Sequence, residues 1–64
     1  MAPLTLTNLD EPHTITLEPV GDRVLYRSYY RGTLQVENRL RELDARRTAR
    51  DLRRDGWVEL KLWT

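Results

Sequence analysis

The sequence predicts an α+β domain in which a small antiparallel sheet of three to four strands carries one helix on one face, in the order β-β-β-α-β. Three observations support this class. Residues 14–18 and 23–31 alternate between apolar and polar side chains, as strands do. Residues 44–55 place apolar side chains at helical spacing. Gly56 then offers a helix stop, and residues 57–63 alternate again.

The first twelve residues are predicted to form an N-terminal arm or a short edge strand, and residues 13–64 to form a single domain. Residues 4–7, Leu-Thr-Leu-Thr, alternate like a strand, but a turn-like cluster at 8–12 interrupts the pattern. Because chain termini that are not held in a sheet are usually mobile, the arm is the favoured alternative.

A hairpin is predicted next. Its first strand covers 14–18, and Pro-Val-Gly-Asp at 19–22 supplies the residues of a reverse turn. The second strand covers 23–31 and is rich in β-forming side chains. One of its faces would carry Val24, Tyr26, Ser28 and Tyr30, and the other Leu25, Arg27, Tyr29 and Arg31.

The middle of the chain leaves two interpretations open. Val36, Leu40 and Leu43 are spaced like one face of a helix. If that helix continued straight to residue 55, however, the same face would meet Arg47. We therefore favour a third strand over 33–39, and a kinked or two-segment helix is the alternative. The inward-facing side chains of the third strand would be Leu34 and Val36.

The predicted helix has one apolar stripe and one arginine stripe. Asp44 is a good N-cap residue, because its carboxylate can accept a hydrogen bond from a free N–H group of the first turn. The apolar stripe consists of Ala45, Thr48, Ala49 and Leu52, and the arginine stripe of Arg46, Arg47, Arg50, Arg53 and Arg54.

The last strand is expected to turn Val58, Leu60 and Leu62 towards the helix. Since one helix covers only one face of a sheet, the other face should stay open and present apolar side chains, a common mark of an interface. That open face would carry Leu25, Tyr29, Trp57 and Trp63, interleaved with Arg27, Glu59 and Lys61. Two alternatives are that the faces are reversed, or that the N-terminal arm covers the aromatic side chains with Leu4, Leu6 and Leu9.

Charge is mildly segregated along the chain. The net charge is +1, but residues 1–30 carry two basic and four acidic side chains, whereas residues 31–64 carry nine and six. Ten of the eleven basic residues are arginine, which suits bidentate and stacked contacts; a GC-rich genome explains the same bias without any function. The absence of cysteine favours a reducing compartment. With neither a membrane-spanning run nor signal-peptide features, we expect a cytoplasmic location.

No catalytic, metal or cofactor site is predicted. His13 is expected to be an exposed residue without a second metal ligand beside it. Ser28 has no base near it in the sequence, and the carboxylates of Asp51 and Asp55 are expected to pair with neighbouring arginines. The glycines are isolated, so no phosphate-binding loop is present.

These features predict a non-enzymatic protein–protein interaction module, such as an adaptor, inhibitor or assembly factor. A first alternative is nucleic-acid binding through the arginine stripe and the strand tyrosines; a second is a homo-oligomer that buries its aromatic face. The acidic residues on the helix and the near-neutral total charge count against nucleic acid. The predicted partner-binding residues are Arg46, Arg47, Arg50, Arg53, Arg54, Leu25, Tyr29, Trp57 and Trp63.

Overall fold

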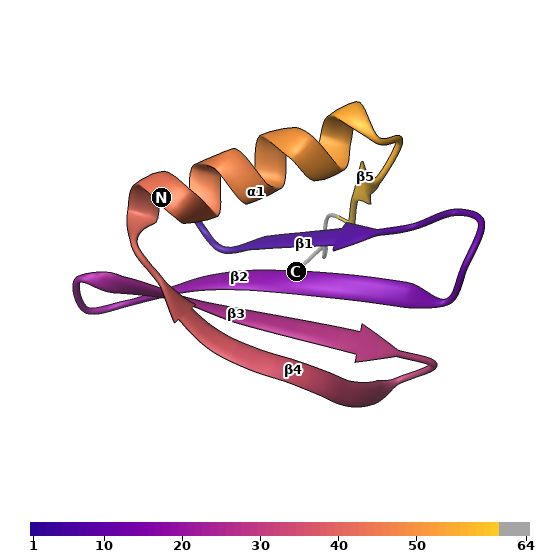
Figure 1. Ribbon diagram of the computed structural model, residues 1–64, viewed down its shortest axis with the longest axis horizontal. Coiled ribbons are helices and arrows are strands. Elements are labelled where there is room, and N and C mark those ends of the chain that lie inside the picture. The colour runs from indigo at the N-terminus through magenta and orange to yellow at the C-terminus, as the bar shows by residue number, and fades with distance from the viewer. Residues whose placement is uncertain (61–64) are drawn as a thin grey trace.

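The computed structural model describes residues 1–60 of the 64. Five strands form one antiparallel sheet in the order β4-β3-β2-β1-β5, and a helix lies on one of its faces (Figure 1). This confirms the predicted α+β class, with one strand more than expected. The elements are β1 (Leu4–Thr7), β2 (His13–Val20), β3 (Arg23–Tyr30), β4 (Thr33–Leu40), α1 (Glu42–Arg54) and β5 (Val58–Glu59).

The additional strand is β1, for which an arm or an edge strand was expected. It lies inside the sheet, between β2 and β5, and Leu6 is fully buried. The favoured arm is wrong; the alternative of a short strand is correct, but not its position at the edge. The reason is that the cluster at 8–12 turns the chain back on itself. The N–H of Asn8 donates to the carbonyl oxygen of His13 at 3.0 Å, which closes the loop and aligns 4–7 with β2.

Two tight turns connect β2, β3 and β4. Gly21 has a φ of 62°, and in the second turn Arg31 and Gly32 have φ values of 52° and 79°. Two consecutive residues with positive φ match the twist of a two-stranded hairpin. The favoured strand interpretation of 33–39 is therefore confirmed, and the helical alternative is wrong.

A register shift interrupts the pairing of β3 with β4. Ser28 lies opposite Val36, whereas Tyr29 lies opposite Leu34, so Gln35 is the additional residue of a β-bulge. Leu34 and Val36 therefore lie on different faces of the sheet and remain 47% and 49% exposed. The expectation that both point inward is wrong, because the bulge turns Leu34 to the face away from α1. Val36 does lie on the helix side, but α1 leaves most of β4 uncovered (Figure 1).

The helix begins three residues earlier than expected, because its N-cap position is residue 41 instead of residue 44. It starts at Glu42, and Arg41 occupies the N-cap position without a side-chain hydrogen bond. Asp44 is thus not the N-cap but a residue of the first turn, where its negative charge interacts favourably with the positive end of the helix dipole. The reason is that β4 extends to Leu40 and leaves a single connecting residue. The predicted stop at Gly56 is confirmed, with a φ of 96°.

The core lies between α1 and the sheet. Two alanines on the buried side of α1 let the helix approach the strands closely. The inward faces predicted for the hairpin and for the helix are confirmed, which excludes the alternative with reversed faces. The buried hydrophobic side chains among the described residues are Leu6, Ile15, Leu17, Val24, Ala45 and Ala49.

The face assignment of the last strand is wrong. In β5, Glu59 lies opposite Leu6, on the helix side, and Val58 lies opposite Thr7, on the other side. An ion pair of 2.9 Å between Arg53 and Glu59 fits this orientation. Val58 and Leu60 are consequently 39% and 47% exposed instead of buried. The predictions for Lys61, Leu62 and Trp63 concern positions outside the described residues.

Within residues 1–60, α1 is the one helix, and its 13 residues are too few and too polar to cross a membrane.

Candidate interaction surfaces

The sheet face away from α1 is open, as predicted. Leu25 and Tyr29 both lie on it and are half-buried. Neither the N-terminal leucines nor Leu9 cover this face, because Leu4 packs against the core on the helix side and Leu9 is 74% exposed. The Nε of Arg27 donates to a Glu37 carboxylate oxygen at 2.7 Å across the same face. This hydrogen bond raises the pKa of Arg27 above its usual value.

Leu25 and Tyr29 line two different pockets. Tyr29 lines a pocket of ≈ 250 Å³ near the start of β1, together with Arg27 and Thr16. Leu25 lines a smaller pocket of ≈ 100 Å³ near the turn between β2 and β3. The two pockets have no lining residue in common, so they offer separate contacts rather than one binding cleft.

Trp57 is not on the open face. It is half-buried on the helix side, packs against the core, and places its ring 5.0 Å from the ring of His13 in an edge arrangement. Its position follows from the chain reversal after α1, where the N–H of Trp57 donates to the carbonyl oxygen of Leu52 at 3.0 Å. Trp57 is thus a packing residue, and Trp63 lies outside the described residues.

The arginine stripe is solvated but largely paired with carboxylates. Guanidinium–carboxylate distances are 3.8 Å for Arg46–Glu42, 3.8 Å for Arg50–Asp51, 3.4 Å for Arg54–Asp51 and 2.9 Å for Arg53–Glu59. The predicted pairing of Asp51 with neighbouring arginines is confirmed. The same prediction for Asp55 is wrong, because none of the ion pairs among residues 1–60 involves it; none involves Arg47 either. The stripe therefore presents a weaker positive field than five free arginines would.

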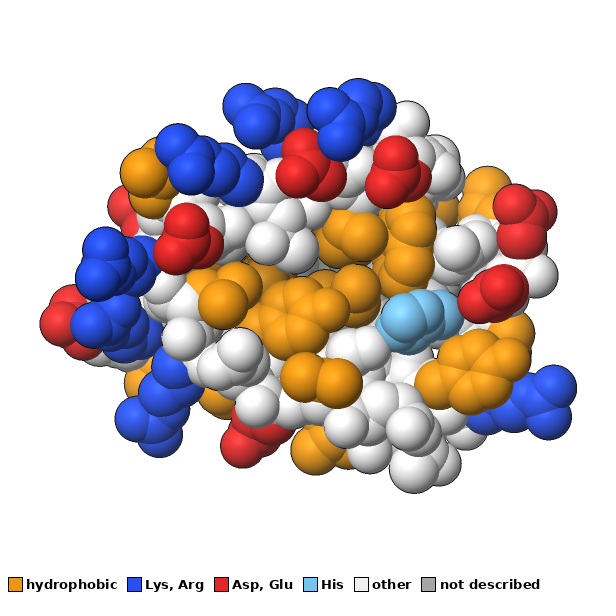
Figure 2. All heavy atoms as spheres, in the orientation of Figure 1, with side chains coloured by type: hydrophobic (Ala, Val, Ile, Leu, Met, Phe, Trp, Pro, Cys, Tyr) orange, Lys and Arg blue, Asp and Glu red, His pale blue; other side chains and the backbone are white. Residues whose placement is uncertain are grey.

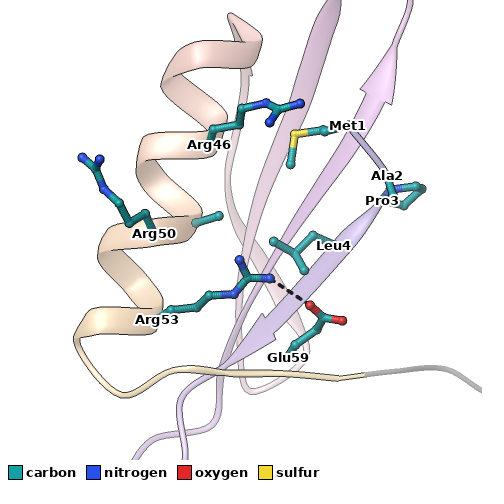
Figure 3. A pocket seen from close by; sticks show the side chains of 9 residues that line it. Met1, Ala2, Pro3, Leu4, Arg46, Arg50, Arg53 and Glu59 are labelled. Atoms are coloured by element: carbon teal, nitrogen blue, oxygen red, sulfur yellow. Dashed lines mark hydrogen bonds and ion pairs between the residues drawn. The ribbon is translucent and has the colours of Figure 1, made fainter.

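Three of these arginines border a groove between α1 and the N-terminal segment (Figure 3). Its volume is ≈ 480 Å³. Arg53 points across it to Glu59, whereas Arg50 points away from β1 in the same view. Beyond the groove, the terminal ammonium group of Met1 lies 2.7 Å from Glu42 and lowers the pKa of that carboxyl group. The groove lining consists of Met1, Ala2, Pro3, Leu4, Arg46, Ala49, Arg50, Arg53 and Glu59.

The edge strand β4 is a surface that the sequence did not single out. It pairs with β3 on one side, and on its other side the sheet of residues 1–60 ends. Seven of its eight residues are exposed, and Leu40 is half-buried. A long open edge with exposed apolar side chains offers its free N–H and C=O groups to a strand of another chain.

Apolar side chains gather beside this edge on the helix side of the sheet. Figure 2 shows them between the helix, which is lined with basic side chains, and the outer strands. Tyr26 and Leu40 pack partly against the core, and Tyr30 and Val36 are 39% and 49% exposed. Because α1 leaves this part of the sheet uncovered, the apolar patch adjoins the open edge of β4.

His13 and Ser28 form a contact that corrects two expectations. The Nε2 of His13 lies 2.6 Å from the Oγ of Ser28, so the serine does have a base beside it, and His13 is half-buried rather than exposed. The hairpin register brings them together, because Ile15 lies opposite Ser28 and His13 is two residues away on the same face. The turn was expected at 19–22, whereas the structure has a two-residue turn at 21–22. Assigning the turn to Gly21 and Asp22 would have predicted this register and with it the contact.

This histidine–serine pair has the distance of a nucleophile and its base, but its surroundings favour a structural role. Ser28 is 5% exposed, and neither residue lines any of the pockets described above. Tyr30 and Trp57 pack edge-on against the imidazole at 6.1 and 5.0 Å. Within residues 1–60, no group of three or more histidine and acidic side chains is placed to hold a metal ion.

No family model matches this chain, and no curated protein or solved structure shows a significant similarity to it. The proposed function therefore rests on the surfaces described above.

Proposed function

We propose that this chain is a small protein-interaction module that binds its partners along β4, where a partner strand extends the sheet. The observation that supports this proposal is the exposure of β4, an eight-residue edge strand of which seven residues are solvent-exposed. Natural proteins usually shorten, cover, charge or bulge such edges to prevent pairing. β4 is long and uncovered, and its bulge at Gln35 leaves residues 36–40 in regular pairing with β3. Strand addition to an open edge is also an established mode of peptide recognition.

The side chains around β4 would supply specificity. On the helix side, Val36 and Leu40 extend the apolar patch that includes Tyr26. On the other side, Leu34 lies beside Tyr29, a predicted contact residue. Main-chain hydrogen bonds would provide much of the affinity, and the alternating side chains would select the partner.

This proposal keeps the predicted class of function but moves its main contact. Leu25 and Tyr29 stay accessible on the open face, whereas the role proposed for Trp57 is withdrawn because that residue packs on the helix side. Adaptor, inhibitor and assembly factor all fit strand addition equally well. A non-enzymatic role and a cytoplasmic location, favoured by the cysteine-free composition, belong to the same proposal.

Nucleic-acid binding through the arginine stripe is the second candidate. It is supported by the groove that Arg46, Arg50 and Arg53 border, where phosphate groups could approach. The carboxylates paired with those arginines weaken this candidate. Replacing the three arginines with glutamate should abolish retention on immobilised nucleic acid if it is correct, and unchanged retention would exclude it.

The strand-addition proposal can be tested with two matched valine substitutions. Val36→Lys places a charge on β4, and Val58→Lys places the same charge on β5, at the opposite end of the sheet. Both valines are partly exposed, at 49% and 39%, so neither substitution empties the core. A partner captured from a lysate of the source cells would be purified and titrated with the unmodified chain and with both variants.

We expect Val36→Lys to weaken binding at least about tenfold, because a charge would be buried beside the added strand, and Val58→Lys to change it less than about twofold. Amide hydrogen exchange in β4 should slow in the complex. The proposal is wrong if the complex forms while exchange in β4 stays as fast as in the free chain.

A further inference from the structure

We infer that β4 selects a second copy of this chain, and that two β4 strands pair antiparallel about a two-fold axis that passes between the two Asn38 residues. This inference rests on the function proposed above and names its partner. The resulting dimer would contain one continuous sheet of ten described strands, with both α1 helices on the same side.

Geometry restricts the registers available to such a dimer. Alternate residues of an edge strand direct their N–H and C=O groups outward, so these groups must face each other in the two copies. Directly opposed residues also point to the same face of the sheet. Only registers with one residue paired to itself at the axis satisfy both conditions. Within β4 the symmetric centres to compare are Val36, Glu37, Asn38 and Arg39.

Charge selects among these centres. A centre at Glu37 or at Arg39 would set two identical charges directly opposite each other, which destabilises a strand pair. A centre at Val36 would place Glu37 opposite Gln35 and Arg39 opposite Thr33, so neither charge would have a charged partner. A centre at Asn38 places Glu37 opposite Arg39 of the second copy, and by symmetry this ion pair forms twice.

The hydrogen bond that Glu37 forms in the single chain is compatible with this pairing. Its carboxylate already accepts a 2.7 Å hydrogen bond from Arg27 through one oxygen, which leaves the second oxygen free for a guanidinium group. Arg39 is exposed, and none of the ion pairs among residues 1–60 involves it. On the face away from α1, the order across the interface would be Arg27, Glu37, then Arg39 of the second copy.

The helix side is complementary in the same register. Val36 would lie opposite Leu40 of the second copy, which joins two partly exposed apolar side chains on each side of the axis. At the centre the two Asn38 side chains would meet. In the single chain the Oδ1 of Asn38 accepts a 3.0 Å hydrogen bond from the N–H of Arg39. On pairing, this N–H would donate instead to the main chain of the second copy, which would free the amide to donate to and accept from the other Asn38. Tyr26 lies beside Asn38 in each copy, so the two tyrosines would flank the amide pair.

The small core gives this association a physical reason. Six hydrophobic side chains are buried among the described residues, and two of them are alanines. A domain of 64 residues buries only about 60% of its unfolded surface, and oligomerisation is a common way to add to that burial. Strand pairing at β4 would cover an eight-residue strand of which seven residues are exposed in the single chain.

The first test uses two charge variants, alone and mixed. In Glu37→Arg, arginines would face arginines across the axis, and in Arg39→Glu, glutamates would face glutamates. A one-to-one mixture restores opposite charges at both positions. Sedimentation equilibrium should show the unmodified chain doubling its mass from 7.6 kDa, each variant dissociating at least about tenfold more readily, and the mixture associating again. Circular dichroism would verify that each variant is folded.

The second test reads the register by cross-linking. The chain has no cysteine, so a single introduced thiol can form only an intermolecular disulfide. Asn38→Cys would place two thiols directly opposite each other, within disulfide range. In Val36→Cys the two thiols would be four residues apart along the strands, about 13 Å, and should not cross-link. A dimer that forms through Val36→Cys but not through Asn38→Cys overturns the proposed register.

Failure of self-association can be distinguished from failure of strand addition in general. If the chain remains monomeric up to about 1 mM, self-association is wrong. In that case, binding of a different protein that slows exchange in β4 would still support strand addition. If the chain dimerises but the charge variants and the mixture behave like the unmodified chain, the proposed pairing at Glu37 and Arg39 is wrong.

Discussion

Two leucines on neighbouring strands test whether the sheet has one covered and one open face. Leu17 lies on the helix side and is 1% exposed, whereas Leu25 lies on the other side and is half-buried. Truncating a fully buried leucine to alanine costs about 2–5 kcal/mol, because apolar contacts are lost and a cavity remains. At Leu25 the truncated side chain would border solvent, so no closed cavity forms and the cost should be about 1 kcal/mol.

The difference is large for a chain of this size. A 64-residue domain has a free energy of unfolding of about 3–10 kcal/mol, so Leu17→Ala should remove a large part of it. Urea unfolding followed by circular dichroism, at one fixed protein concentration, would give both values. The assignment of the faces would be refuted if Leu25→Ala destabilised the chain as much as Leu17→Ala.

Three smaller perturbations probe individual contacts, each by urea unfolding. Ser28→Ala should lower the free energy of unfolding by about 1 kcal/mol, because the half-buried His13 loses its hydroxyl partner; no change would show that the contact is not formed. Arg31→Asn should raise it by up to about 1 kcal/mol, since asparagine tolerates the positive φ of this turn; a decrease would show that the stacking of Arg31 on Tyr30, at 5.7 Å, matters more. Glu42→Gln should be destabilising at neutral pH because it removes the ion pair with the Met1 ammonium group. Since the folded-state pKa of Glu42 is lowered from 4.5, the deficit should shrink as the pH falls through that lowered pKa, and a deficit independent of pH would contradict this assignment.

Local patterns predicted the elements that are covered on one face. Alternation in β2 and β3 identified both strands and their inward faces, since α1 buries Leu17 and Val24 and leaves Leu25 outside. Helical spacing and Gly56 likewise located α1 and its end. These elements follow the sequence because burial on one side imposes the periodicity that the sequence displays.

Features that depend on register or on distant partners could not be read in this way. The alternation in β5 was visible, but its face is set by pairing with β1 and by the ion pair of Glu59 with Arg53. Leu34 and Val36 were assigned to one face because a β-bulge is not evident from alternation. The main candidate site moved to β4 because alternation along the chain does not show which strand lies at the edge of the sheet.

Amide hydrogen exchange of the unmodified chain at low and at high protein concentration tests the central claim most directly, because it observes the backbone of β4 itself. We predict that the outward-facing amides of β4 exchange more slowly at high concentration, while the amides of the helix change little. Exchange rates in β4 that do not depend on concentration would contradict self-pairing. If they also did not change in a complex with any captured partner, β4 would not be the binding edge.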